Sequence, residues 1–361
     1  MGKPRLPFFY RIFPAFLLAA ASAGAFAEDV DWAKRVEDAR ALEAAGKPAE
    51  ALEAWKAIVL DLPAERAIEF RTAMDSAHAF LQSAGKYQEM EGLFRSASER
   101  RPADIIAASY LAMTLQLRSK FPEAEAVYRR ITPAGGVTAA WASFNLGLIL
   151  LREPAREMEA VDAFLASLRG NPTPAAADQA DRIALIRVAR RCFDDARRIW
   201  ASIAETEGLE PAKRARALLM IEMIEYQQGR LDEAEALIRR AMEFSPGDPE
   251  LPNNLALVLL SRGDEKGALE ATGRALALDP AFADSLEVLG TFYFKRKQPE
   301  KAMEYYRRGH ASAVAGLKKT TAAFEEGKRS KAPDLAQREY DWNRARYRLF
   351  RFETHLRGLA K

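Results

Sequence analysis

The residue types that usually carry catalysis or bind metals are few in this chain, and none of them occurs at a recognisable spacing. The histidines are His78, His310 and His355, and each lacks a second histidine, a cysteine or a carboxylate at the spacing of a helical zinc motif such as H-E-x-x-H. We therefore predict no metal site. We interpret the histidines as helix residues, with His78 at a contact between helices.

Cys192 is the only cysteine, so the chain cannot form an internal disulfide. It lies in the segment A-R-R-C-F-D-D, at an expected turn between two helices, and we interpret it as a half-buried structural thiol. A redox role or a disulfide to a second molecule is the alternative. Gel mobility with and without reductant separates the two.

Motifs of the common enzyme classes are absent from the sequence. There is no G-x-S-x-G elbow, no Walker A loop and no dinucleotide-binding fingerprint. The adjacent carboxylates Glu325-Glu326 and Asp194-Asp195 point apart on a helix, so we interpret them as solvated charges and not as an acid–base couple. The sequence predicts a protein that is not an enzyme and has no cofactor, although motifs do not address a site assembled from distant segments.

The elements that must hold these residues repeat along the chain with a period of 34 residues. A period of this length is typical of stacked helix–turn–helix units, each of which buries its apolar face against its neighbours. The abundance of alanine and the lack of alternating β-branched runs also indicate a chain that is almost entirely helical. The matching positions are Gly229 and Gly263; Ala234, Ala268 and Ala302; Ala241, Ala275 and Gly309; and Pro246 and Pro280.

The segment from residue 249 to 282 illustrates one such unit. Leu255 and Leu259 fall on one face of a first helix, and Gly263 ends that helix because glycine accepts a positive φ angle. Pro280 ends the second helix, because it has no N–H group and clashes with the preceding turn.

This pattern resembles the tetratricopeptide repeat, W-x2-L-G-x2-Y…A-x3-F…P. The fullest match is Leu289-Gly290-x2-Tyr293…Ala302-x3-Tyr306, whereas Ile238 and Thr272 replace the second aromatic residue in two units and no unit has the initial tryptophan. The step from alanine to an aromatic residue recurs at Ala51/Trp55, Ala124/Tyr128, Ala160/Phe164 and Ala196/Trp200, with Met90/Phe94 as a near match.

The resemblance covers about eight units, and it implies an all-α fold, a right-handed α-solenoid of helix–turn–helix units over residues 28–316. A C-terminal helical cap would follow in residues 317–361. The units are placed at residues 32–65, 71–104, 105–138, 140–174, 177–210, 215–248, 249–282 and 283–316, with one inserted residue near Pro154.

Residues 1–27 have the pattern of a secretory signal peptide. Lys3, Arg5 and Arg11 precede or flank a short apolar run, and the segment ends in Ala25-Phe26-Ala27, an A-x-A cleavage site. We predict cleavage after Ala27 and a periplasmic location, with an uncleaved inner-membrane anchor as the alternative. The stretch is shorter than the roughly 20 residues that a membrane-spanning helix needs.

Charge is balanced over the expected mature chain but uneven along it. Residues 28–361 hold 51 basic and 51 acidic residues, which gives no basis for nucleic-acid binding. Residues 317–361 hold 12 basic and six acidic residues, so this segment is basic and the repeats are acidic.

The C-terminal segment is expected to form two helices joined by a polar stretch at residues 325–333. Its role has two interpretations. It caps the exposed apolar end of the array, as solenoids require, or its aromatic and arginine residues, among them Trp342 and Arg346, bind an anionic partner such as lipid headgroups, a cell-wall polymer or an acidic protein.

The family resemblance further implies that the first helix of each unit lines a concave groove. The lysine/asparagine/arginine clamp by which some members hold a C-terminal carboxylate does not recur, because Asn253 and Asn254 lack basic partners. An apolar groove with methionines suits an amphipathic helix or an extended apolar segment; packing within a tight superhelix is the alternative. The expected groove residues are Met113, Phe144, Leu148, Leu219, Met223, Tyr226, Asn253, Leu257, Leu260, Glu287, Thr291 and Phe294.

Together these features predict a non-enzymatic scaffold or adaptor of the bacterial cell envelope that binds a protein or peptide in its groove. A membrane- or polymer-associated structural factor that docks through the basic C-terminal segment is the second hypothesis. The sequence identifies neither the partner, nor the pathway, nor the oligomeric state.

Overall fold

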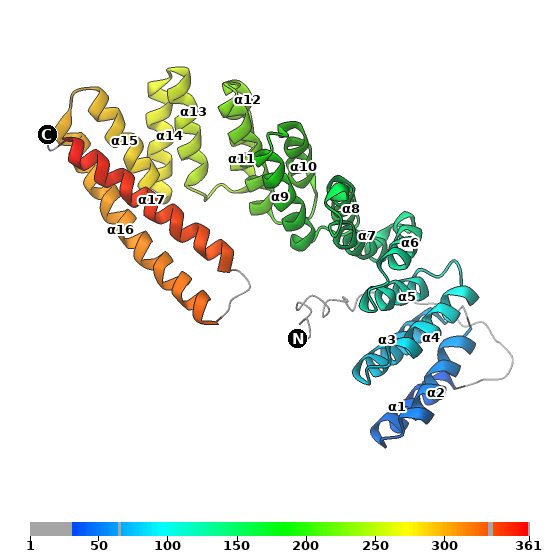
Figure 1. The fold of residues 1–361 in the computed structure, drawn as a ribbon. Coiled ribbons are helices and arrows are strands. Elements are labelled where there is room, and N and C mark those ends of the chain that lie inside the picture. The colour runs from blue at the N-terminus through cyan, green and yellow to red at the C-terminus, as the bar shows by residue number, and fades with distance from the viewer. Residues whose placement is uncertain (1–30, 64–65, 331–334, 360–361) are drawn as a thin grey trace. The chain divides into compact units, whose positions relative to one another are not determined.

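The computed structural model describes residues 31–63, 66–330 and 335–359, and all regular structure in these ranges is helical (Figure 1). The expected signal peptide lies outside the described residues. Contacts within the chain divide it into two compact units, up to Arg100 and from Arg101 onward. In the described parts of the chain, no helix is both long and apolar enough to cross a membrane.

The unit up to Arg100 contains two helix pairs. They are α1 (Trp32–Ala44) with α2 (Pro48–Asp61), and α3 (Ala67–Ser83) with α4 (Tyr87–Arg100). Trp55, Phe70 and Phe94 are fully buried in its core, where small residues such as Ala51 allow the helices to approach closely.

The unit from Arg101 onward contains six further pairs and one additional helix. Each helix packs against the next along the chain, which is the arrangement of an α-solenoid. The pairs are α5 (Ile105–Leu117) and α6 (Phe121–Ile131); α7 (Gly136–Leu150) and α8 (Glu157–Gly170); α9 (Pro174–Ala189) and α10 (Phe193–Glu205); α11 (Pro211–Gln227) and α12 (Leu231–Phe244); α13 (Glu250–Arg262) and α14 (Glu265–Leu278); and α15 (Ala283–Lys295) and α16 (Pro299–Ser330), followed by α17 (Leu335–Leu359). The short 3-10 helices η2 (Thr132–Ala134) and η3 (Pro154–Arg156) lie in two of the connections.

The turns within the pairs follow the 34-residue period. Gly263 ends α13 with a φ angle of 85°, as its position in the repeat predicts, and Gly229 makes the same turn one period earlier with a φ angle of 75°. One period later Lys297 takes this role with a φ angle of 56°, which is unfavourable for a residue with a Cβ atom. The turn therefore depends on its place in the repeat and not on glycine alone.

The aromatic residues four positions after the repeat alanine are fully buried, and the tryptophans and tyrosines among them hydrogen-bond to the preceding helix. Tyr128 donates to Gln116 Oε1 at 2.8 Å, and Trp200 Nε1 donates to Asp181 Oδ1 at 2.7 Å. A buried hydroxyl or indole N–H requires such a partner. Pairs with a tryptophan or tyrosine at this position are thus held both by burial of a ring and by one specific polar contact.

The last unit is longer than the repeat predicts. α16 is continuous from Pro299 to Ser330, so the expected boundary after residue 316 falls inside a helix, and the stretch expected as a link at residues 325–333 is helical as far as Ser330. The prediction of a link was therefore wrong for residues 325–330, because polar and charged residues are compatible with an exposed helix. On this helix they form ion pairs one turn apart, Lys328 with Glu325 and Arg329 with Glu326.

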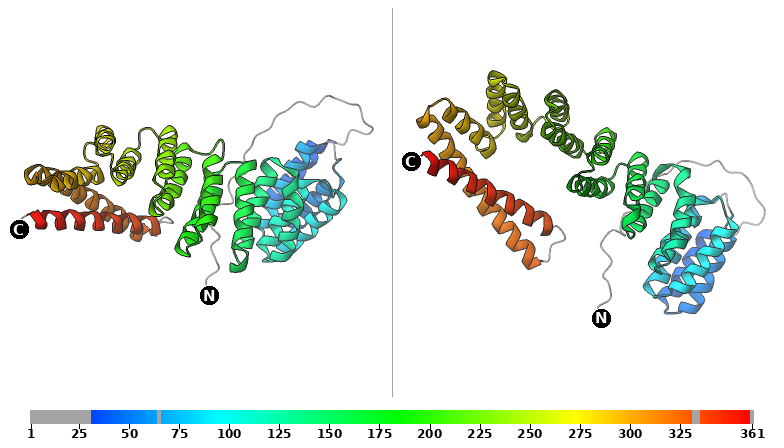
Figure 2. Two further views of the ribbon diagram at one scale, coloured as in Figure 1. Left: turned by 90° about the horizontal axis from the view of Figure 1, so that it is seen from above. Right: turned by 45° about the horizontal axis from the view of Figure 1, so that its top comes forward.

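α17 runs back along α16 in the opposite direction (Figures 1 and 2). The fully buried Phe352 joins Tyr306, Ala302 and Ala313 in a small core between these helices, with Leu349 and Leu356 packed against it. α17 therefore covers apolar surface of the last helix pair.

Candidate functional site

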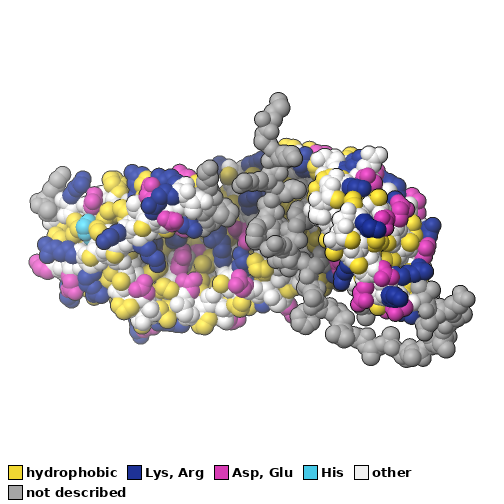
Figure 3. All heavy atoms as spheres, turned by 90° about the horizontal axis from the view of Figure 1, so that it is seen from below, with side chains coloured by type: hydrophobic (Ala, Val, Ile, Leu, Met, Phe, Trp, Pro, Cys, Tyr) yellow, Lys and Arg dark blue, Asp and Glu magenta, His cyan; other side chains and the backbone are white. Residues whose placement is uncertain are grey.

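Two adjoining crevices lie between the first helices of the last three pairs and α17. One crevice, of about 760 Å³, is lined mainly by α13, α15 and α17, and the other, of about 730 Å³, by α11, α13 and α17. They share the residues Tyr226, Glu250, Asn254, Leu257 and Arg344, so we treat them as one continuous surface and call it the groove. On the face drawn in Figure 3, this part of the molecule presents apolar side chains among charged side chains of both signs.

α17 forms its wall of the groove through a row of ion pairs. Arg348 binds Asp284 in a bidentate manner, with nitrogen–oxygen distances of 2.9 and 2.6 Å, and Arg344 contacts Glu250 at 3.1 Å. Glu250 and Asp284 are one repeat apart on α13 and α15, and the two arginines are one helical turn apart on α17. Bidentate pairs between arginine and a carboxylate fix orientation as well as charge.

A second set of contacts continues this row toward the end of α17. Arg351 pairs with Glu287 of α15, and His355 Nε2 lies 3.0 Å from Glu287 Oε1 while its ring stacks on Tyr306 at 4.6 Å between centroids. Burial, and then the charge of Arg351, lower the pKa of His355. Arginines of the C-terminal segment thus neutralise carboxylates of the repeats.

The tetratricopeptide repeat model matches residues 182–249 and 253–313 of this chain, which hold most of the groove. The helix pairs of the structure continue the same period on the N-terminal side of that match. These two segments are tetratricopeptide repeats. Proteins of this family generally serve as non-catalytic scaffolds for protein–protein interaction.

Several solved structures are similar to this chain. A tetratricopeptide repeat protein from Parabacteroides merdae is 16% identical with a TM-score of 0.32, over 78% of this chain and 93% of that chain. YrrB, described as a TPR protein with an unusual peptide-binding site, is 21% identical with a TM-score of 0.33, over 54% of this chain and 96% of that chain. MamA is 16% identical with a TM-score of 0.35, over 46% and 94% of the two chains. Among curated proteins, no sequence matches significantly.

The structure divides the expected groove residues into two sets. Leu257 and Tyr226 are the most exposed members of the set that lines the groove, at 40% and 38% of their surface, so packing between repeats does not use up this apolar surface. Asn253 is buried and accepts a hydrogen bond from Ser285 at 2.9 Å. The set that lines the groove is Leu219, Met223, Tyr226, Asn253, Leu257, Leu260, Glu287 and Thr291.

The other expected groove residues lie elsewhere. Met113 is buried within α5, which is enclosed by its neighbours over most of its circumference, and Phe144 packs on Phe164 at 5.6 Å between ring centroids. Leu148 is half-buried on α7, and Phe294 is 54% exposed at the end of α15. These four residues do not line the groove.

Trp342 and Arg346 also lie outside the groove lining. The Trp342 ring stacks on Phe324 of α16 at 5.3 Å, and its Nε1 donates to Thr321 at 3.1 Å. The Arg346 guanidinium lies 4.6 Å from the centre of the Trp342 ring. This pair belongs to the contact between α16 and α17.

Basic residues do line the crevice beside Asn253 and Asn254, although they come from outside the repeat positions at which a clamp was expected to be absent. α17 places Arg344, Arg348 and Arg351 in the same crevice as both asparagines. Repeat spacing could not reveal them, because α17 does not follow the repeat. The carboxylates Glu250 and Asp284 were the available signal, since acids one period apart indicate a row of charge that a basic segment can meet.

Sequence reasoning also missed Glu222, which lines the second crevice from α11. Only 7% of its surface is exposed, and it makes no hydrogen bond or ion pair with any described residue. Burial, and then the nearby charge of Glu250, raise the pKa of Glu222 to about 7. A buried carboxyl without a partner is unusual, because removing a charge from water is unfavourable unless another group compensates for it.

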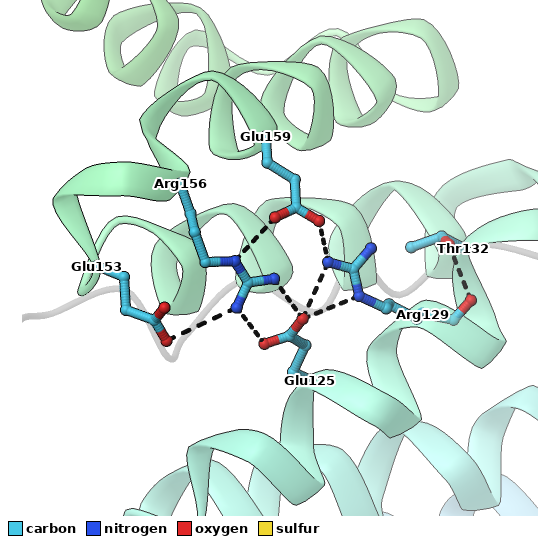
Figure 4. A network of polar contacts seen from close by, with 6 residues as sticks. All are labelled: Glu125, Arg129, Thr132, Glu153, Arg156 and Glu159. Atoms are coloured by element: carbon cyan, nitrogen blue, oxygen red, sulfur yellow. Dashed lines mark hydrogen bonds and ion pairs between the residues drawn. The ribbon is translucent and has the colours of Figure 1, made fainter.

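A separate cluster of charge, outside the groove, joins α6 to α8 (Figure 4). Arg156 of η3 binds Glu125 with distances of 2.8 and 2.6 Å and Glu159 at 2.8 Å, while Arg129 contacts the same two glutamates. The hydrogen bonds from Arg156, followed by those from Arg129, lower the pKa of Glu125 to about 2. We interpret this network as a structural link between neighbouring repeats.

The remaining chemistry-bearing residues are dispersed. His78 stacks on Phe94 at 6.2 Å, at a contact between α3 and α4 as expected, and burial lowers its pKa to about 4. Cys192 is half-buried at the N-terminus of α10, in the expected turn. Over the described ranges, no three histidine, cysteine, aspartate or glutamate side chains gather as metal ligands would.

Proposed function

We propose that this protein is a scaffold of the bacterial cell envelope that binds a segment of a partner protein, as a peptide or short helix, in the groove between α11, α13, α15 and α17. The observation that supports the proposal is the continuous surface formed by the two crevices, with exposed Leu257 and Tyr226 at its middle. Apolar side chains that remain accessible inside a concave surface are typical of sites for peptides.

The composition of the groove supports a peptide over a flat protein surface. Leu219, Met220 and Met223 of α11 offer adaptable apolar contacts, and the neighbouring Asn254 and Thr291 offer hydrogen-bonding groups to a main chain. The walls come from helices that are packed on their neighbours, so the groove is largely formed before the ligand arrives.

Site-specific photo-crosslinking in cells tests this function. A photoreactive residue is placed at Met223 or Leu257 in the groove. The matched control is Leu278 of α14, which is 45% exposed and lies outside both crevices. We expect one discrete protein adduct from the groove positions and none from position 278. Equal adducts from all three positions, or none from the groove, would contradict the proposal.

Export to the periplasm is part of the same proposal and rests on residues 1–27. Fractionation of cells, with the intact mass of the purified protein, tests it. We expect a periplasmic protein whose intact mass corresponds to a chain that begins at Glu28. A protein that retains residues 1–27 in the membrane fraction would favour the inner-membrane anchor.

Docking on a membrane or polymer through the C-terminal segment is the second candidate function. Phe350 is 59% exposed on α17, close to the exposed Arg346 and Arg357, which supports such a surface. Arg344, Arg348 and Arg351 are already paired with carboxylates of the groove, however, and this reduces the charge available to an anionic partner. This candidate would be favoured if the protein sediments with anionic vesicles and if removal of residues 335–361 abolishes that sedimentation.

A further inference from the structure

We infer that the second crevice of the groove holds a basic side chain, lysine or arginine, of the bound segment, and that Glu222 is its principal counter-charge. The inference rests on the proposed function and adds the chemistry by which the groove selects its ligand. Three observations carry it: the isolation of Glu222, the charges around the crevice and the apolar lining of its walls.

The first observation is that the Glu222 side chain is isolated from hydrogen-bond and ion-pair partners among the described residues. Glu222 lines the crevice, only 7% of the surface of this residue is exposed, and no described side chain or backbone group donates to its carboxyl group. Other buried glutamates of these repeats have partners: Glu225, three residues later on the same helix, pairs with Arg197 and Arg230. Glu222 therefore presents an unused acceptor to whatever occupies the crevice.

The charges around the crevice are the second observation. Its charged lining consists of Arg216, Glu222, Asp248, Glu250, Asp341 and Arg344. Arg216 contacts Asp181, outside the crevice, at 3.6 Å, and Arg344 contacts Glu250 at 3.1 Å. Neither arginine pairs with Glu222, so the lining acids Glu222 and Asp248 have no ion pair with a described basic residue. Complementary charge in a recess selects a cation and disfavours an anion.

The walls are the third observation. The same crevice is also lined by apolar and aromatic residues: Leu219, Met220 and Met223 of α11, Leu257 of α13 and Tyr340 of α17. Lysine and arginine combine an aliphatic stem with a charged end, so the stem contacts these apolar walls while the end reaches the carboxylates. A simple metal cation would leave the apolar surface unused.

The first crevice lacks this bias, which locates the selectivity. Its charged lining consists of Glu250, Glu265, Asp284, Glu287, Lys295, Arg296, Arg344, Arg348 and Arg351. Here each acidic residue has an arginine partner. The pairs are Glu250 with Arg344, Asp284 with Arg348, Glu287 with Arg351 and Glu265 with Arg296. The apolar part of the ligand is thus expected over the first crevice and its basic residue over the second.

Peptides selected on the full chain from a phage-displayed random library provide the probe. We expect enrichment of sequences with lysine or arginine beside apolar residues. For an enriched lysine peptide, replacement of the lysine by norleucine, an uncharged residue of similar shape, should weaken binding by about tenfold or more. Glu222→Gln should weaken the lysine peptide to the same degree and leave the norleucine peptide unchanged.

Two further variants separate this inference from the proposed function. Glu270→Gln changes an exposed acid outside both crevices and should leave both peptides unaffected. Leu257→Glu changes the shared floor of the crevices and should abolish binding of both peptides.

One result would overturn this inference and leave the proposed function standing. In that result Leu257→Glu abolishes peptide binding, but the selected peptides are not enriched in lysine or arginine and Glu222→Gln has no effect. If neither Leu257→Glu nor Glu222→Gln affects binding, or if no peptide is selected at all, the proposed function is contradicted and this inference with it.

Discussion

Phe352 of α17 lies over Gly309 of α16, and a methyl group at position 309 would overlap the aromatic ring. The ring is fully buried against Tyr306 and Ala302 of the last repeat, so α17 covers apolar surface at the end of the array. This contact supports the cap interpretation of the C-terminal segment, and the row of ion pairs to α13 and α15 adds a second role as a wall of the groove.

Replacement of Phe352 by alanine should therefore destabilise the protein. Loss of a fully buried phenylalanine lowers the free energy of unfolding by about 3–5 kcal/mol, and thermal or urea unfolding followed by circular dichroism measures it. Phe350→Ala is the control, because this residue is 59% exposed on the same helix and should change stability by less than about 0.5 kcal/mol. Equal effects of the two substitutions would mean that α17 is not packed as a cap.

The same close approach of a ring to a glycine occurs inside the repeats. A Cβ atom at Gly147 of α7 would lie 2.6 Å from the ring of Phe164, which is itself fully buried. Gly147→Ala should lower the free energy of unfolding by about 1–3 kcal/mol, because the ring cannot move aside without displacing other packed groups.

A second glycine in a helix is the control for this prediction. Gly273 of α14 has nothing within 4 Å of a Cβ position, so Gly273→Ala should raise stability by up to about 1 kcal/mol through helix propensity alone. Urea unfolding of the two variants measures the difference. Stabilisation by both substitutions would show that the Gly147 contact is not tight.

The sequence predicted the helix pairs because the signals that define them are local. Gly263 ends a helix through its own backbone, and an alanine such as Ala268 permits a close crossing wherever the repeat places it. The tetratricopeptide resemblance and the all-α fold are confirmed by the family match and by the helix pairs.

The position of α17 could not be predicted in the same way. It depends on contacts between residues 64 positions apart, Arg348 with Asp284 and Arg351 with Glu287, in a segment without the repeat. The groove was consequently predicted from one wall only. Glu222 was missed because its isolation is a property of its surroundings, and nothing in its sequence neighbourhood distinguishes it from the paired Glu225.

The charge cluster between α6 and α8 makes stability depend on acid pH. The pKa of Glu125 is lowered to about 2 by its arginine partners, below the ordinary value of 4.5 that applies when the chain is unfolded. The folded state then binds fewer protons than the unfolded state, so this contribution is present above about pH 4.5 and is lost as the pH falls toward 2.

Glu125→Gln should remove that contribution. We expect a decrease of about 1 kcal/mol near neutral pH, a modest value because solvent reaches the cluster and screens it. Urea unfolding at neutral pH and below pH 3 measures both values, and the difference between variant and wild type should shrink at the lower pH. Glu270→Gln, at an exposed site on α14, should show no such dependence. A difference that is constant with pH would place the effect in packing and not in charge.

Glu222 gives the opposite dependence. Burial, with the charge of Glu250, raises its pKa from 4.5 to about 7, so the folded state binds more protons than the unfolded state between these values. The carboxyl therefore lowers stability progressively as the pH rises from about 4.5 to about 7, and its full destabilising effect is present above pH 7. Glu222→Gln, which removes the charge but keeps the shape, should raise the free energy of unfolding by about 1–2 kcal/mol near pH 8 and change it little near pH 4.

The same variant is expected to bind a lysine peptide more weakly. A gain in stability with a loss of affinity would identify Glu222 as a residue that serves ligand binding at the expense of the fold. If Glu222→Gln instead lowers stability near pH 8, the carboxylate has a stabilising partner in the folded protein and is not free for a ligand.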